Sequence, residues 1–128
     1  MELNEKLELI HTALDEKKGV DVVTLDVSGQ TQMMDYLVIC TGTSNVHIRA
    51  LSDGVMEKMK ERGYKGVRAE GYNEARWVLL DYGDVVLHIF AEDDREFYRL
   101  EEFWKGAPRL DASGEAVETA EEEPTPVA

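Results

Sequence analysis

Apolar residues recur at two different spacings along the chain, and the change between them predicts the order of helices and strands. Over residues 3–17 they recur at helical spacing, with Glu and Lys between them. The β-branched segment 20–27 and the continuous apolar run 36–41 predict two strands. A second helical pattern follows and ends at Gly63. The first half of the chain therefore predicts helix, strand, strand, helix.

Residues 77–90 predict a β-hairpin with two different faces. If Tyr82 and Gly83 are its two turn residues, Asp81 pairs with Asp84. One face then carries only aliphatic side chains: Val78, Leu80, Val85, Leu87 and Ile89. The opposite face carries Trp77, Leu79, Val86, His88 and Phe90, and it ends in Asp81 and Asp84. The aliphatic face is suited to packing under helices, whereas the mixed face needs more of this chain or a partner to cover it.

The remaining segments complete the prediction of a single α/β (α+β) domain over residues 1–110. A short strand is expected at residues 67–70, and a last helix at residues 95–104, with Asp93 or Asp94 as its cap. Phe97, Leu100 and Trp104 form one face of that helix, and Tyr98 points elsewhere. This order predicts a mixed sheet of about five strands with helices packed on it.

Composition and charge narrow the function classes. The chain has a net charge of -13, and residues 111–128, with six acids, no base and no aromatic residue, predict an acidic disordered tail. Direct nucleic-acid binding is disfavoured because residues 1–110 and the tail each carry a net negative charge, which repels phosphate. No apolar run is long enough to span a membrane, and the N-terminus lacks a targeting pattern, so a cytoplasmic location is expected. Cys40 stands alone in an apolar segment and predicts a buried hydrophobic side chain.

An enzymatic alternative rests on the turn formed by Gly42, Thr43 and Ser44. Hydroxyls and free amides at a helix N-terminus can hold an anion, and nucleotidyltransferases place a Gly-Ser turn before a helix. Their chemistry also needs paired carboxylates that hold Mg²⁺, and no such pair follows Ser44 on a predicted strand. Asp26, Asp35 and Asp81 are the carboxylates that a small nucleotidyltransferase-like enzyme could use. Thr43 or Ser44 as a plain N-cap is the simpler interpretation.

Other polar residues have structural and functional interpretations side by side. His88 fits a packed histidine or an interface contact, since no second metal ligand stands at a suitable spacing. Asp81 and Asp84 fit local turn chemistry or docking of a basic partner. Trp77 fits the core or the centre of a protein interface, where Trp is prominent. Tyr98 and Trp104 fit the core or a dimer contact. The residues alone predict no cofactor and no metal site.

Several linked motifs resemble the ribosomal silencing factor (RsfS, Iojap) family. They are residues 35–44 (DYLVICTGTS), Glu70 with Gly71, residues 77–90 (WVLLDYGDVVLHIF), and residues 95–101 (REFYRLE) with Trp104. The likeness covers residues 3–110 in the same order throughout. It implies a fold similar to a nucleotidyltransferase without the catalytic carboxylates, and therefore a protein that is not an enzyme.

The resemblance also implies a partner and a site. The family binds ribosomal protein fourteen of the large subunit, blocks joining of the small subunit and represses translation when nutrients are scarce. The residues carried over are Trp77, Leu79, Asp81, Tyr82, Asp84, Val86 and His88. Ribosomal proteins are generally basic, so the carboxylates are expected to assist encounter while Trp77 provides the desolvated centre. A homodimer is another expected use of exposed apolar surface.

Overall fold

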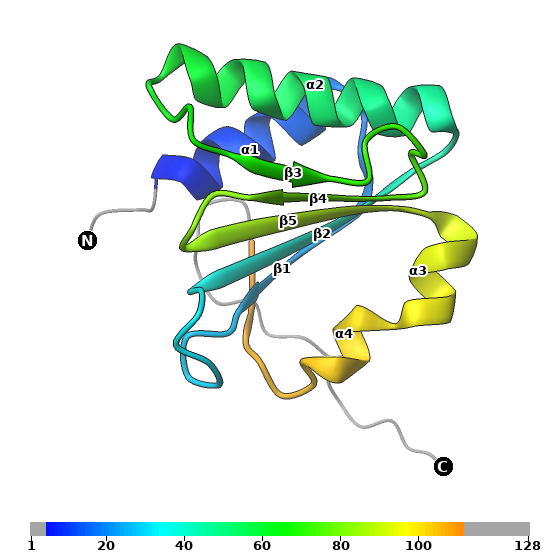
Figure 1. The fold of residues 1–128 in the computed structure, drawn as a ribbon. Helices are drawn as coiled ribbons and strands as arrows, with labels where there is room; N and C mark the ends of the chain where they lie inside the picture. Colours follow the sequence, from blue (N-terminus) through cyan, green and yellow to red (C-terminus); the bar gives the residue numbers. More distant parts are fainter. Residues whose placement is uncertain (1–4, 112–128) are drawn as a thin grey trace.

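The computed structural model describes residues 5–111. It confirms a mixed α/β sheet with helices on both sides (Figure 1). The elements are α1 (Glu5–Glu16), β1 (Val20–Asp26), β2 (Tyr36–Gly42), α2 (Asn45–Glu61), β3 (Arg68–Glu70), β4 (Trp77–Asp81), β5 (Val85–Ala91), α3 (Glu92–Tyr98), α4 (Leu100–Phe103) and β6 (Arg109–Leu110). The predicted acidic tail, apart from Asp111, and the first residues of the predicted N-terminal helix lie outside the described residues.

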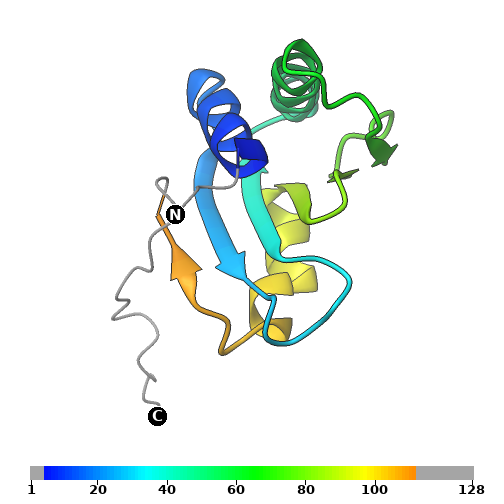
Figure 2. The same ribbon diagram turned by 90° about the vertical axis from the view of Figure 1, so that its left-hand side faces the viewer.

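The sheet has six strands in the order β3-β4-β5-β2-β1-β6, one more than the sequence predicts. β2 and β5 run parallel at its centre, and every other neighbouring pair is antiparallel. The additional strand, β6, is two residues long and pairs with β1 through Thr24 and Leu110, as Figure 2 shows at the edge of the sheet. Two residues are too few to give a readable alternation, so sequence patterns did not predict this strand.

One face of the sheet packs against α1 and α2. The aliphatic hairpin face lies in this core, together with buried residues of α1 such as Leu7 and Ile10 and of α2 such as Leu51 and Val55. Cys40 is buried in the same cluster, and burial raises the pKa of its thiol to about 11, so the thiol stays protonated and behaves as a hydrophobic side chain. The prediction that helices cover the aliphatic hairpin face is confirmed.

The other face of the sheet holds a second core beneath α3, α4 and the segment that follows them. Leu25, Ile39 and Phe90 are fully or almost fully buried there, and Leu100 and Trp104 pack against them. Trp77 and Leu79 are only partly buried at its margin. The chain therefore covers part of the mixed face and leaves the part nearest β4 open.

The hairpin register differs from the prediction by two residues. Leu79 pairs with His88 and not with Val86, and the turn residues are Gly83 and Asp84, because the Tyr82 amide donates to the Val85 carbonyl at 3.0 Å. Gly83 has a positive φ of 93°, as a two-residue turn with glycine in first place requires. Apart from Asp84, which now lies in the turn, the two faces keep their predicted members, since a shift by two residues preserves the alternation of side chains.

The predicted last helix is two short helices with a sharp break. Arg99, at φ 46° and ψ 51°, ends α3 and begins α4 in the left-handed conformation. Neither Asp93 nor Asp94 caps α3, which starts at Glu92 without a side-chain cap. The break leaves Phe97 76% exposed, while Leu100 and Trp104 pack against the core, so Trp104 follows the core interpretation and not the dimer one.

Candidate functional site

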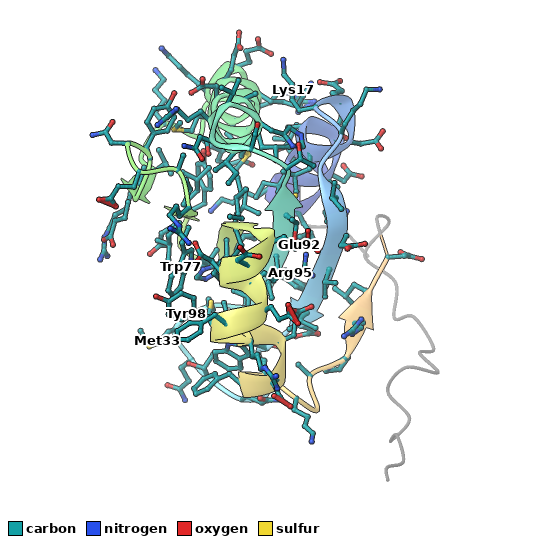
Figure 3. All side chains as sticks on the ribbon, turned by 90° about the vertical axis from the view of Figure 1, so that its right-hand side faces the viewer. Lys17, Met33, Trp77, Glu92, Arg95 and Tyr98 are labelled. Atoms are coloured by element: carbon teal, nitrogen blue, oxygen red, sulfur yellow. The ribbon has the colours of Figure 1, made fainter. Side chains whose placement is uncertain are left out.

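The candidate site is the open part of the mixed hairpin face together with one residue of α3. We call it the Trp77 surface and define it as Trp77, Leu79, Val86, His88 and Tyr98. Trp77 faces His88 of β5 and Tyr98 of α3, with ring centroids 5.9 Å and 4.5 Å away. Figure 3 shows Trp77, Tyr98 and Met33 along one side of α3, with Glu92 and Arg95 on the other side. Side chains from β4, β5 and α3 thus come together around Trp77.

A hydrogen bond between two side chains holds the Trp77 indole in place. Its Nε1 donates to Nδ1 of His88 at 2.9 Å. The indole N–H can only donate, so Nδ1 of His88 is unprotonated and the ring proton lies on Nε2. Burial lowers the pKa of His88 to about 4, against a smaller opposing effect of the Asp81 carboxylate. At neutral pH His88 is therefore an uncharged acceptor that orients Trp77.

Exposure divides the predicted residues of this face into an outer and an inner group. Trp77, Leu79 and Asp81 are partly exposed and alternate along β4 with buried residues. Val86 and His88 on β5 are 8% and 7% exposed. The structure therefore brings these predicted residues together, but only the β4 side chains lie where a partner can touch them directly. Val86 and His88 support them from below.

Two predicted site residues lie elsewhere, and their placement on the mixed face is wrong. Tyr82 is 7% exposed and packs in the core beneath α1 and α2, where burial raises the pKa of its phenol to about 12. The Asp84 carboxylate accepts a hydrogen bond from Lys6 Nζ of α1 at 2.8 Å. Both differences follow from the turn at Gly83 and Asp84, which sends these two side chains toward the helices.

Asp81 keeps its predicted place, and its carboxylate performs the turn chemistry expected of it. Oδ1 accepts a hydrogen bond from the Gly83 amide at 2.8 Å. The side chain is still partly exposed beside Leu79, so its charge also faces solvent at the margin of the Trp77 surface. Of the two carboxylates predicted at the end of this face, only Asp81 remains beside the Trp77 surface, because Asp84 pairs with Lys6.

Tyr98 extends the surface beyond the residues selected from the sequence, and Met33 lies on the same side of α3 in Figure 3. Tyr98 is 48% exposed and Met33 is 85% exposed. The signal for Tyr98 was its position off the apolar face of the predicted last helix. Met33 lies in the loop between β1 and β2, where no periodic pattern indicates its direction. Exposed aromatic and Met side chains are enriched where proteins bind one another.

The Gly42, Thr43 and Ser44 turn behaves as a helix cap. The Ser44 side chain accepts a hydrogen bond from the His47 amide at 3.0 Å, which makes Ser44 the N-cap of α2. The Thr43 amide donates to Nδ1 of His47 at 2.8 Å. The capping interpretation is confirmed, and it engages the Ser44 hydroxyl and the amides of Thr43 and His47.

The carboxylates of the enzymatic alternative lie far from that turn. Asp26 pairs with Tyr36 at the start of β2, and Asp35 precedes this strand. Asp81 pairs with Val86, which lies beside Leu37. The turn follows the opposite end of β2, which at seven residues spans about 20 Å. Within residues 5–111 no group of three His, Cys, Asp or Glu side chains could hold a metal ion.

A cleft of about 990 Å³ adjoins the turn at the carboxyl ends of β2 and β5. Its charged lining comprises Asp21, Glu92, Asp93, Glu96, Glu101 and Glu102 against Arg95, Arg99, Lys105 and Arg109. Six acids against four bases do not favour a nucleotide phosphate there. Neither the geometry nor the charge of this cleft supports the nucleotidyltransferase-like alternative.

The fold and the site define a small mixed α/β domain whose candidate site is an open aromatic surface. The family model described as "Ribosomal silencing factor during starvation" matches residues 1–128, including the stretch that the motifs left out. The chain is 40% identical over 114 residues to ribosomal silencing factor RsfS of Halalkalibacterium halodurans, covering 89% of this chain and 97% of the relative. It therefore belongs to the ribosomal silencing factor family, whose name places it in translation regulation.

Two further comparisons agree with this family membership. RsfS of Bacillus subtilis is 39% identical over 111 residues, which cover 85% of this chain and 94% of that protein. A crystal structure of a protein from Chromobacterium violaceum superposes with a TM-score of 0.78 at 37% identity, covering 83% of this chain and 88% of that one. None of the described helices is both long and apolar enough to cross a membrane.

Proposed function

We propose that this protein binds ribosomal protein fourteen of the large ribosomal subunit through the Trp77 surface and blocks joining of the small subunit. Membership of the ribosomal silencing factor family supports a ribosomal target. The main structural support is the Trp77 surface itself. In it Trp77 is partly exposed, is fixed by His88 and is extended by Tyr98. The mechanism is steric occlusion in the cytoplasm, which lowers translation when nutrients are scarce, with no bond made or broken.

The chemistry of the surface fits a basic protein partner. Trp77 and Leu79 supply apolar area that a partner can desolvate, and rigid aromatic side chains dominate the binding energy of many interfaces. The net charge of -13 attracts a cationic protein over a longer range and speeds encounter. The same charge repels ribosomal RNA, so the proposed contact is with protein.

Replacing Trp77 by alanine tests the proposal. The Trp77→Ala variant is expected to lose about 30-fold in affinity for the large subunit, because the centre of the contact surface disappears. Co-sedimentation with separated large and small subunits measures the loss, and the yield of joined ribosomes measures the functional consequence. Circular dichroism checks that the sheet is retained.

Val46→Ala is the matched control for this experiment. Val46 is 74% exposed at the start of α2, on the side of the sheet away from the Trp77 surface. This variant removes exposed apolar area without touching the proposed site, so its affinity should equal that of the wild type. Equal retention of wild type, Trp77→Ala and Val46→Ala on the large subunit would refute the proposed contact.

A second prediction concerns the charge of Asp81. Asp81→Asn keeps an oxygen that can accept the Gly83 amide but removes the negative charge. The association rate with the large subunit is expected to fall about twofold at low salt, with little change in the dissociation rate. Stopped-flow measurements at low and high salt separate the two rates. Glu57→Gln, on the exposed side of α2, should leave both rates unchanged.

Self-association stays a prediction beside this proposal. Phe97 and Phe103 are 76% and 74% exposed, and the Phe97 ring lies 5.0 Å from the Tyr98 ring of the Trp77 surface. A homodimer through them would compete with the ribosome for neighbouring residues. Sedimentation velocity over a range of protein concentrations measures it.

A further inference from the structure

The position of Tyr98 beside Trp77 depends on α3, a helix with little apolar attachment to the sheet. None of the seven residues of α3 is buried. The Tyr98 ring contacts Trp77 and Phe90, but no side chain of the helix is fully buried, so polar contacts are needed to fix the place of α3 over the second core. Two arginines make such contacts, and they differ in exposure: the side chain of Arg76 is 64% exposed and that of Arg95 is 13% exposed.

Arg95 joins four parts of the chain through one guanidinium group. Its Nε and Nη2 donate to the Glu101 carboxylate at 3.2 Å and 2.9 Å, across the break between α3 and α4. Its Nη1 donates to the Thr41 hydroxyl at 2.7 Å and to the Asp21 carbonyl at 2.8 Å. Arg95 thus ties both short helices to the ends of β1 and β2.

The sheet register shows why this anchor determines the place of Tyr98. Thr41 of β2 pairs with Phe90 of β5, and Phe90 pairs with Trp77 of β4, so the three residues lie in one row across the sheet. Arg95 and Tyr98 are three residues apart and lie on adjacent turns of α3. Arg95 is fixed at Thr41, one end of this row, and this places Tyr98 over Trp77 at the other end of the row.

The break between α3 and α4 also depends on the contacts of Arg95. Arg99 adopts a left-handed conformation that is costly for a residue other than glycine. The pair between Arg95 and Glu101 spans this residue and is mostly buried, with side-chain exposures of 13% and 28%. A bidentate pair with such limited exposure holds geometry better than a solvated one.

We propose that Arg95 is a positioning residue for ribosome docking: it holds α3 so that the Tyr98 ring rests on Trp77 and the two rings present one contact surface. The inference rests on the proposed function and adds a residue that contacts no partner itself. The Arg95 guanidinium reaches the ends of β1 and β2, away from Trp77 (Figure 3), so its effect on binding passes through Tyr98.

The expected result is a loss of affinity that depends on Tyr98. Arg95→Ala should bind the large subunit about tenfold more weakly than the wild type, and Tyr98→Ala should lose a similar factor. Arg95→Lys keeps the charge but cannot form the two-pronged pair, so it should fall between wild type and Arg95→Ala. Arg62→Ala, which removes the pair with Glu5 on the other layer, is the matched control and should bind normally.

A double-mutant cycle separates positioning from general stability. If Arg95 acts through Tyr98, the double variant should bind no more weakly than Tyr98→Ala alone. Additive losses, or wild-type affinity of Arg95→Ala, would overturn the inference. If Trp77→Ala loses binding in the same assay while Arg95→Ala keeps it, only the positioning role fails. If Trp77→Ala also binds normally, the proposed docking surface fails and the positioning role fails with it.

Discussion

Gly71→Ala is expected to lower the free energy of unfolding by about 4 kcal/mol. Gly71 has a φ of 82°, where an L-residue costs about 1–2 kcal/mol. A Cβ at this position would also lie 2.2 Å from the Trp77 carbonyl oxygen, and backbone atoms cannot yield as a flexible side chain can. Relieving such overpacking costs about 1–3 kcal/mol more. Urea unfolding followed by circular dichroism measures the loss.

Gly83→Ala is the matched comparison for that change. Gly83 has a φ of 93°, close to that of Gly71, but a Cβ there meets nothing within 4 Å. This variant should lose only the conformational part, about 1 kcal/mol. The difference between the two variants therefore isolates the steric conflict at Trp77. Equal losses would show that the close approach of Gly71 to the Trp77 backbone does not matter for stability.

The faces of the hairpin could be predicted from sequence, although its register could not. Alternation with a period of two assigns each residue of a strand to one side, whatever its partner. The turn is a local choice: both Tyr82 with Gly83 and Gly83 with Asp84 place a glycine in a two-residue turn. Burial of the Tyr82 ring under the helices favours the second choice, and that is a tertiary effect.

The last helix shows another limit of sequence patterns. Residues 95–104 have the apolar spacing of one continuous helix, and arginine is a good helix former. Nothing local marks Arg99 as the point where the helix breaks. Two of the contacts that accompany the break, from Arg95 to Thr41 and to Asp21, reach far along the chain. A pattern within ten residues cannot contain these two contacts.

The sequence could predict the site residues that share a face through strand alternation. It could not predict those that come together only when the chain folds. Trp77, Leu79, Val86 and His88 share the predicted face because they alternate along two paired strands. Their different exposure reflects how far the C-terminal segment covers the sheet, which alternation does not encode. Tyr98 joins them only because α3 returns across the sheet, so a contact between residues 77 and 98 follows from the fold.

His88 should make the stability of the protein depend on pH between about 4 and 6.5. Burial lowers the pKa of His88 to about 4 in the folded protein, whereas the unfolded chain keeps the ordinary value near 6.5. Below pH 6.5 the unfolded state binds a proton that the folded state excludes. The stabilisation is therefore complete above pH 6.5 and declines as the pH falls, reaching a loss of about 3 kcal/mol near pH 4.

His88→Gln isolates this contribution. Glutamine does not titrate, and its side-chain oxygen can still accept the Trp77 indole N–H. Burial also lowers the pKa of His11. The effects of His11 and of the carboxylates on stability are the same in both proteins, so they cancel in the difference between the two pH profiles. Urea unfolding at several pH values between 7 and 4 should show the wild type losing about 3 kcal/mol more than the variant. Parallel pH profiles would mean that His88 is not a buried neutral acceptor. The predicted decline would instead mean that His88 stays uncharged at neutral pH, which keeps the Trp77 ring oriented.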